Sequence, residues 1–279
     1  MVADAAVKFE PLYLRLPEGR GERFCVFHPA VGAIRAAVLY VAPFAEEMNK
    51  ARRIAARQAR AFASAGCAVL LLDLKGCGDS PGDFGEASWA DWVADVAAAA
   101  RWLRERTAAP LWLWGVRAGC LLLSEATPRI DDCVGWLLWQ PPVSGRGPAQ
   151  QFLRLRLAAG LIGGDTKGAA ATLRTDIEQQ GEIEVAGYRL PRALLEGFEQ
   201  SVLAAPSPGI AVHWLEISSA SDDTLLPASK QRIEQWRTSG VCVEATVVPG
   251  PAFWQVTEIE DAPALLEASC TAVLGSTRK

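Results

Sequence analysis

Short apolar runs alternate with helical segments along the first half of the chain. "PLYLRLP" and "RFCVFHP" flank a polar link, which predicts a hairpin of two antiparallel strands. The runs "AAVLYVA", "CAVLLLD", "LWLWG" and "VGWLLWQ" lack polar alternation, as do strands covered on both faces. Helix formers at helical spacing lie between them, over about 49–65, 89–106 and 117–126. We therefore expect a mostly parallel sheet with right-handed crossovers and helices on both faces.

The alternation stops after Pro141 and resumes near residue 209. Residues 143–208 have the pattern of helices with one short strand-like piece, "IEVAGYRL". The strands "GIAVHWLEI" and "VCVEATVV" then follow, each with a helix after it. This gives eight strands with an insertion after the sixth. The expected domains are a core of residues 1–142 and 209–279 and an inserted cap of residues 143–208.

The fifth strand runs directly into "GVRAG" and then into an apolar helix. This is the layout of the Gly-x-Ser-x-Gly nucleophile elbow, and the order of elements resembles the α/β-hydrolase fold. The expected fold class is therefore α/β, with the eight-stranded, mostly parallel sheet of that fold and a cap. Arg117 stands at the centre of the elbow. A guanidinium stays protonated and has no lone pair with which to attack.

Of the other two positions of a catalytic triad, the acid is present and the histidine is replaced. In "SSASDDTLLP", Asp223 precedes Pro227 by four residues, where this fold commonly carries its acid. Phe253 stands in the loop after the last strand, where a histidine base is needed. The two histidines, His28 and His213, lie in predicted strands, where we expect hydrogen-bonded structural side chains. One triad residue of three is thus retained.

Arg117 has two interpretations, which are compatible with each other. Its fork of donors suits a carboxylate or phosphate ligand in the pocket. An internal ion pair with Glu46, Glu47 or Asp223 would offset the cost of burying the guanidinium, and we favour this interpretation. The candidate catalytic residues are Arg117, Glu47 and Asp223. The residues expected to line the substrate pocket are Phe44, Glu46, Val116, Gln140, Phe253 and Trp254.

Composition narrows the classes of partner. The chain has 28 basic and 32 acidic residues and no basic run, so nucleic acid is not an expected partner. No apolar stretch approaches the ~20 residues of a membrane span, and the start lacks a signal-peptide core, which together predict a cytoplasmic protein. The seven cysteines include no Cys-x-x-Cys pair and suit buried positions better than metal sites. We expect neither a metal nor a cofactor.

Several segments carry a closer resemblance. "APFAEEMNKARR", "CAVLLLDLKGCGDSPGDF", "LWLWGVRAG", "LLWQPPVSG", "QFLRLRLAAG" and "VPGPAFWQ" resemble the second class of exosortase A system-associated hydrolases. These are bacterial proteins encoded with the machinery for exopolysaccharide production and protein sorting. The resemblance covers about residues 9–265. It implies a hydrolase, that machinery as a partner, and arginine as the usual residue on the elbow.

Two functions remain open at this point. The first is hydrolysis of an ester or thioester, with Glu46, Glu47 or Asp223 activating water and Arg117 with the elbow amides stabilising the oxyanion. The second is an inactive pseudo-hydrolase that binds an anionic small molecule or a partner protein. An ion pair that fills the pocket would disfavour both functions, whereas an open pocket is compatible with both.

Overall fold

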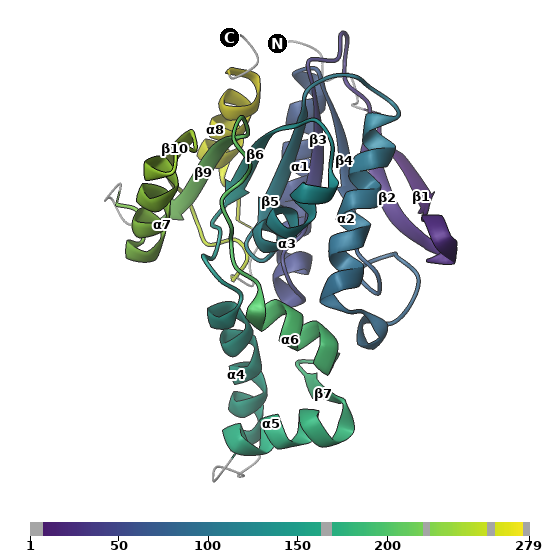
Figure 1. Ribbon diagram of the computed structural model, residues 1–279, viewed down its shortest axis with the longest axis vertical. Coiled ribbons are helices and arrows are strands. Elements are labelled where there is room, and N and C mark those ends of the chain that lie inside the picture. The colour runs from purple at the N-terminus through teal and green to yellow at the C-terminus, as the bar shows by residue number, and fades with distance from the viewer. Residues whose placement is uncertain (1–7, 163–168, 220–223, 256–259, 276–279) are drawn as a thin grey trace.

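The computed structural model describes residues 8–162, 169–219, 224–255 and 260–275, and its centre is one eight-stranded sheet (Figure 1). The strand order is β1-β2-β4-β3-β5-β6-β9-β10. Strand β2 is antiparallel to both of its neighbours, and the remaining pairs are parallel. The expected eight-stranded, mostly parallel sheet is therefore confirmed. The strands are β1 (Glu10–Arg15), β2 (Glu22–His28), β3 (Ala36–Val41), β4 (Cys67–Leu72), β5 (Leu111–Val116), β6 (Cys133–Trp139), β9 (Ala211–Ser218) and β10 (Val243–Pro249).

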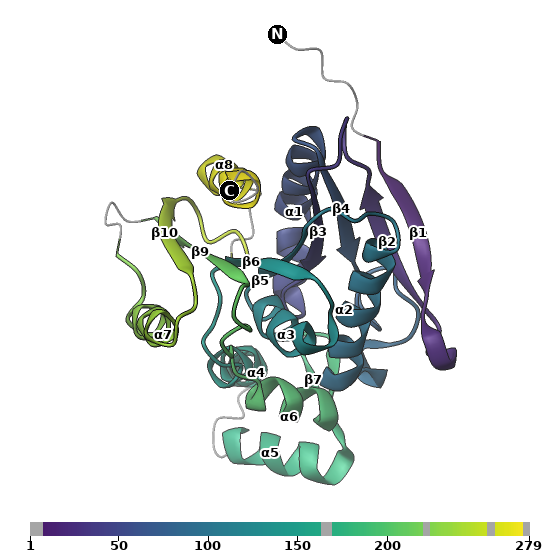
Figure 2. The ribbon, with the colours of Figure 1, turned by 45° about the horizontal axis from the view of Figure 1, so that its top comes forward.

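Helices cover both faces of this sheet. Figure 2 shows α1 and α8 on one face and α2, α3 and α7 on the other. Their bounds are α1 (Glu46–Ser64), α2 (Trp89–Arg104), α3 (Gly119–Ala126), α7 (Pro227–Thr238) and α8 (Pro263–Gly275), with short 3-10 helices η1 (Pro17–Gly19), η2 (Phe84–Glu86) and η3 (Thr127–Arg129). Within the described ranges, none of the helices combines the length and the apolar character that a membrane span requires.

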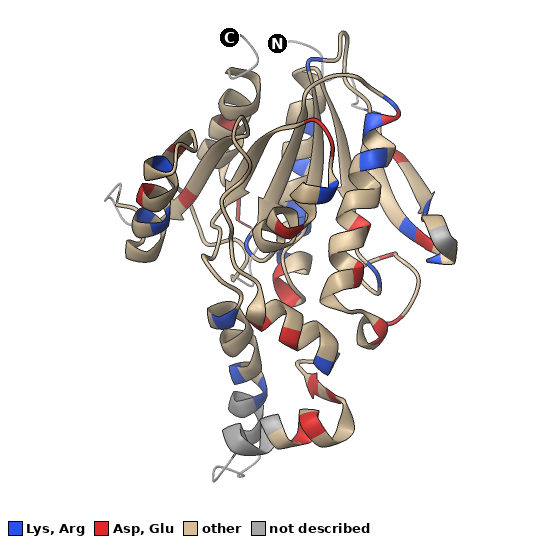
Figure 3. Ribbon diagram, in the orientation of Figure 1, with Lys and Arg blue, Asp and Glu red and all other residues tan. Residues whose placement is uncertain are grey.

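Charged side chains are absent from the central strands of this arrangement. In Figure 3 the Lys, Arg, Asp and Glu residues lie mainly on helices and loops, and the central strands β3, β4, β5 and β6 contain none. Strands buried on both faces have no position at which a charge meets water, so their sequences become continuous apolar runs. This is the physical origin of the pattern that predicted them.

The segment between β6 and β9 projects from one end of the sheet (Figure 1). It consists of α4 (Arg146–Ile162), α5 (Ala169–Gln180), the hairpin of β7 (Glu182–Val185) and β8 (Tyr188–Pro191), and α6 (Arg192–Gln200). The strand-like piece expected here is thus a hairpin, because Ala186 and Gly187 both have positive φ, +50° and +82°, as a tight two-residue turn requires. The domain boundaries at 143 and 208 stay predictions.

Helix α1 begins earlier than expected. Asn49 was the predicted start, but the helix begins at Glu46, so that Glu46 and Glu47 form its first turn. Carboxylates at this end interact favourably with the unpaired N–H groups and the positive end of the helix dipole. The earlier start puts Glu47 on a rigid element directly after β3, facing the elbow that follows β5.

Candidate active site

The elbow between β5 and α3 is a strained turn with an arginine at its centre. Arg117 has φ +52°, a left-handed conformation that side chains other than glycine rarely adopt. Its N–H donates to the Trp139 carbonyl at 2.9 Å, and its own carbonyl accepts from the Cys120 N–H at 2.9 Å. These two bonds fix the turn between the neighbouring strand β6 and the helix that follows.

Both elbow glycines are required by close approach of the backbone. A Cβ on Gly115 would lie 2.8 Å from the Cα of Cys120, and one on Gly119 would lie 2.3 Å from the Val41 carbonyl oxygen. Contacts this short do not occur between unbonded atoms, so neither position accepts a side chain without moving the turn. The Gly-x-x-x-Gly spacing is therefore a property of the turn and does not depend on which residue stands between the glycines.

The Arg117 side chain forms an ion pair with Glu47. Its Nε donates to both carboxylate oxygens at 3.3 Å, and Nη2 donates to Oε1 at 3.2 Å. The side chains are 13% and 24% exposed, so the pair is largely shielded from water. Nη1 has no acceptor among the described residues, and the guanidinium carbon lies 5.4 Å from the ring centre of Trp254. Glu46 makes no such contact, and Asp223 lies outside the described residues.

Burial changes the protonation equilibrium of Glu47. The pKa of its carboxyl is raised because burial disfavours the charged form, and the charge and hydrogen bonds of Arg117, followed by the charge of Lys50, oppose this only in part. A carboxylate with a raised pKa is a stronger base than an exposed one. Glu47 is thus better suited to accept a proton near neutral pH than the sequence position alone suggests.

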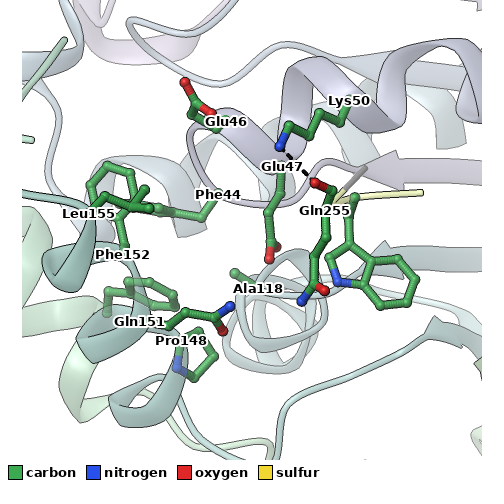
Figure 4. Close-up of a pocket in the computed structure, with 12 residues that line it drawn as sticks. Phe44, Glu46, Glu47, Lys50, Ala118, Pro148, Gln151, Phe152, Leu155 and Gln255 are labelled. Carbon is green, nitrogen blue, oxygen red and sulfur yellow. Dashed lines mark hydrogen bonds between the residues drawn. The ribbon is translucent and has the colours of Figure 1, made fainter. Parts of the chain in front are cut away.

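A cavity of about 280 Å³ lies beside the ion pair. Figure 4 shows the Glu47 carboxylate reaching into it from α1, near Ala118 of the elbow and Gln255, whose carbonyl accepts from Lys50 Nζ at 3.0 Å. The inserted segment closes the opposite side with residues of α4 and α6. The lining residues are Phe44, Glu46, Glu47, Lys50, Ala118, Pro148, Gln151, Phe152, Leu155, Phe198, Trp254 and Gln255.

An aromatic cluster joins this cavity to the core. Phe44, in the loop after β3, stacks on Phe198 of α6 with ring centres 4.6 Å apart and meets Phe152 of α4 edge-on at 5.2 Å. Rings in these arrangements bury large apolar areas and contribute about 0.5–1.5 kcal/mol per pair beyond that burial. The inserted segment is therefore anchored at the cavity, and it supplies an apolar wall opposite the charged floor.

Comparison with known proteins agrees with this arrangement. A sequence model of the family described as serine aminopeptidase, S33, matches residues 32–170. The structure resembles a thermostable carboxyl esterase of Bacillus coagulans, solved with glycerol (TM-score 0.64, 15% identity, 96% of this chain and 99% of that chain). The chain has the α/β-hydrolase fold.

Two further solved structures are similar over nearly their whole length. Est1E of Butyrivibrio proteoclasticus, solved with ferulic acid, has a TM-score of 0.62 at 14% identity and covers 95% of this chain and 97% of its own. A serine hydrolase without a lid from Xanthomonas campestris has a TM-score of 0.56 at 17% identity, covering 97% and 94%. No curated protein sequence matches the chain.

Two backbone amides correspond to the oxyanion donors of α/β-hydrolases, which are the N–H after the nucleophile and one from the loop after the third strand. In this chain they belong to Ala118 and Phe44, and both residues line the cavity. Neither N–H donates to an acceptor in the described part of the chain. The amides that would hold an oxyanion therefore keep their N–H groups free of acceptors within the described part of the chain, although the nucleophile is missing.

Three of the residues expected in the pocket lie outside the lining of the cavity. Val116 is fully buried in β5. Gln140 has φ +45° and joins β6 to β9, because its Oε1 accepts from the Ile217 N–H at 2.7 Å. Phe253 packs edge-on against the rings of Trp139 and Trp254. Phe44, Glu46, Glu47 and Trp254 do line the cavity.

The thiols and hydroxyls near the elbow serve the fold. Cys120 is fully buried, and burial raises the pKa of its thiol. Burial likewise raises the pKa of Cys77 to about 12, and Ser80 Oγ bridges the Asp73 carbonyl and the Phe24 N–H. The described cavity lining contains no serine, threonine, cysteine or histidine. No group of three or more possible metal ligands is found in the described part of the chain.

Proposed function

We propose that the protein hydrolyses a small ester or thioester by direct attack of water, with Glu47 as the general base. The observation that carries this proposal is the Glu47 carboxylate, which lines the cavity beside Ala118 and has a raised pKa. Because the described lining offers no serine, threonine or cysteine, the acyl-enzyme of a serine or cysteine hydrolase has no residue on which to form. Water is then the attacking group.

The reaction can be followed atom by atom. Glu47 accepts a proton from water as the water oxygen attacks the carbonyl carbon, and the carbonyl oxygen becomes an oxyanion. The N–H groups of Phe44 and Ala118 hold that oxyanion. Collapse of the tetrahedral intermediate breaks the bond to the alkoxide or thiolate, which takes the proton back from Glu47. Arg117 acts as a positioning residue, since three contacts with its Nε and Nη2 fix the orientation of the base.

The lining of the cavity suggests the class of substrate. Phe152, Leu155 and Phe198 form an apolar wall that suits an acyl group, while Lys50 and Gln255 offer polar contacts at the other side. The resemblance to exosortase A system-associated hydrolases favours an acylated saccharide precursor, a place in the cytoplasm and a partner in the exopolysaccharide or protein-sorting machinery.

A second candidate function is that of a non-catalytic binding protein. It is favoured by the Arg117–Glu47 pair, which occupies the centre of the elbow, and by Phe253, which is buried where a histidine base is needed. In this case the unpaired Nη1 of Arg117 and the free amide of Ala118 would bind the anionic group of a small molecule. Alternatively, the inserted segment would hold a partner protein.

The test is hydrolysis of p-nitrophenyl esters and acyl thioesters of two to eight carbons by the full chain. We expect turnover above the buffer rate, and a loss of at least about 100-fold in kcat/KM for Glu47→Gln, which keeps the shape and removes the base. Glu234→Gln on α7 is the control, because Glu234 is exposed and does not line the cavity, and its kcat/KM should be unchanged. Circular dichroism confirms that both variants fold.

Two results would contradict the proposal. If the wild type matches buffer across the panel, the binding function replaces it, and calorimetry with octanoate and with inorganic phosphate is the next measurement. If the wild type turns over but Glu47→Gln does so equally well, the protein is a hydrolase with a different base, and Asp223 is the next residue to replace.

A further inference from the structure

A second cavity of about 260 Å³ lies on the other side of α1 from the candidate active site. Its walls are the inner face of α1 and the strands β2, β3 and β4, and no residue lines both cavities. Val26, Met48 and Leu71 make much of the wall apolar. The proposed hydrolysis has no use for this space, so its lining calls for a separate explanation.

Two buried polar side chains of this lining have no hydrogen-bond partner. His28 is 2% exposed and Tyr40 is 5% exposed, yet both ring nitrogens of His28 and the hydroxyl of Tyr40 are unpaired. Buried polar groups are nearly always paired, and each one left unpaired costs about 1–3 kcal/mol. The sequence predicted a hydrogen-bonded structural histidine at position 28, and this prediction is wrong, because neither ring nitrogen has a hydrogen-bond partner among the described residues.

Of the charged residues that line this cavity, two pair with each other and one has no partner among the described residues. Arg52 donates to both carboxylate oxygens of Asp73, at 3.1 and 3.0 Å, so the single acidic residue of the lining is already neutralised. Arg60 is exposed, lines the cavity, and makes no ion pair or hydrogen bond with any described residue. The lining therefore presents one unpaired cation, Arg60, whose charge acts on the unpaired ring of His28, whereas the charges that act on the Tyr40 hydroxyl include those of Arg52 and Asp73.

We propose that this cavity is a second ligand site, which binds a small carboxylate with an apolar body. The carboxylate oxygens accept from the Arg60 guanidinium and from a ring N–H of His28, which gives both groups a partner. The apolar body lies against Val26, Met48 and Leu71. A cationic ligand is disfavoured because the one carboxylate in the lining is already bound to Arg52.

The volume sets the size of the ligand. A water molecule occupies about 30 Å³ of the liquid, so the cavity holds the volume of about nine waters. A carboxylate of about ten non-hydrogen atoms, such as phenylacetate or octanoate, matches that volume and carries both the charge and the apolar body.

The test is isothermal titration calorimetry of the full chain with phenylacetate and octanoate. We expect saturable binding of at least one of them, and binding about tenfold weaker or more for phenylacetamide, which keeps the shape and removes the charge. Arg60→Gln should weaken carboxylate binding by about tenfold. The matched control is Arg57→Gln on the same helix, because Arg57 pairs with Asp261 and does not line the cavity, and it should bind as the wild type does.

A cavity-filling variant locates the site. Ala55 lines the second cavity and is absent from the first, so Ala55→Leu should abolish binding. As a readout that does not depend on this variant folding, the ring-proton NMR signals of the two histidines can be followed during the titration and assigned with His28→Phe. The His28 signal should shift with the same Kd. Absence of binding at millimolar ligand, binding that Arg60→Gln leaves unchanged, or a His28 signal that does not move would each overturn the proposal.

Discussion

Arg117 and Glu47, which are 70 residues apart in the sequence, meet through three N–H···O contacts of 3.2–3.3 Å at the carboxyl ends of β5 and β3. In an α/β-hydrolase with a full triad, the first of these positions carries the nucleophile. Here the nucleophile position carries the cation of Arg117 instead. Its partner, Glu47, lies at the start of α1, directly after the loop whose Phe44 N–H corresponds to an oxyanion-hole donor. The nucleophile position and the segment that begins with the Phe44 amide are thus joined by an ion pair.

The strength of this pair can be measured with a double-mutant cycle of Glu47→Gln, Arg117→Gln and the double variant. We expect a coupling of about 1–3 kcal/mol in the free energy of unfolding, between the values for exposed and fully buried pairs, because both side chains are partly shielded. Urea denaturation at neutral pH gives the four values. Additive effects of the two substitutions would mean that the pair does not form in solution.

The raised pKa of Glu47 predicts a pH dependence of stability. Since burial raises this pKa above the unfolded value of 4.5, the folded chain binds a proton more tightly than the unfolded chain does. The resulting stability is present below the unfolded pKa and is lost as pH rises through the folded pKa. The wild type should therefore lose stability relative to Glu47→Gln between pH 4 and pH 7, as urea midpoints would show. A constant difference would contradict the raised pKa.

His28 predicts a dependence of the opposite sign. Burial, and then the charge of Arg60, lower its pKa from 6.5 to about 4, so the fold favours the neutral ring. The stability is complete above pH 6.5 and is lost as pH falls toward 4, by about 3 kcal/mol. His28→Phe should remove this loss, while His213, whose pKa is also lowered, remains in both proteins and cancels from their difference. Parallel stability curves for the two proteins between pH 7 and pH 4.5 would show the prediction to be wrong.

The elbow backbone predicts that Gly119→Ala is severely destabilising. Its Cβ would lie 2.3 Å from the Val41 carbonyl oxygen, so β3 or the elbow must move, at a cost of about 3 kcal/mol or more. Gly147→Ala in α4 is the matched control, since an added Cβ there meets nothing within 4 Å. We expect it to be neutral or to stabilise the helix by up to about 1 kcal/mol. Thermal unfolding compares the two variants, and similar melting temperatures would refute the argument.

Replacing Arg117 by serine should not create a serine esterase. A serine hydroxyl needs a base within hydrogen-bond reach, and the described cavity lining contains no histidine. Glu47 meets Arg117 only at Nε and Nη2, which lie well beyond the position of a serine Oγ. Phe253 is buried against Trp139 at the position where one is needed. We expect no labelling of Arg117→Ser by a fluorophosphonate probe and no burst of p-nitrophenol. Stoichiometric labelling at residue 117 would show that another base reaches the elbow.

The order of elements was predictable because strands buried on both faces, such as β3 and β5, cannot carry charge, and because the elbow can accept only glycine at 115 and 119. The ion-pair partner of Arg117 could not be predicted. Glu46, Glu47 and Asp223 were equivalent in the sequence, and Glu47 was selected by the start of α1, which fixes the direction of each side chain on the first turn. Asp223 stays a prediction, outside the described residues.

The misplaced pocket residues have a related cause. Gln140 looked like a pocket residue because it follows a strand, but its left-handed backbone turns the side chain toward the Ile217 N–H. The lack of hydrogen-bond partners at His28 could not be predicted either. The sequence shows that a histidine lies in a strand, but any hydrogen-bond partners would come from other strands and from α1. Backbone conformation and tertiary neighbours decided both cases.

Helix α1 is a wall of both cavities. Glu47 lines the first from the opening turn, and Met48, Ala55 and Arg60 line the second further along the same 19 residues. A helix of that length spans about 28 Å, so a ligand that displaces α1 as one body in the second cavity also displaces Glu47 in the first. Thermodynamic linkage then requires reciprocity. If a ligand in the second cavity changes the affinity at the elbow by some factor, a ligand at the elbow changes the affinity of the second cavity by the same factor.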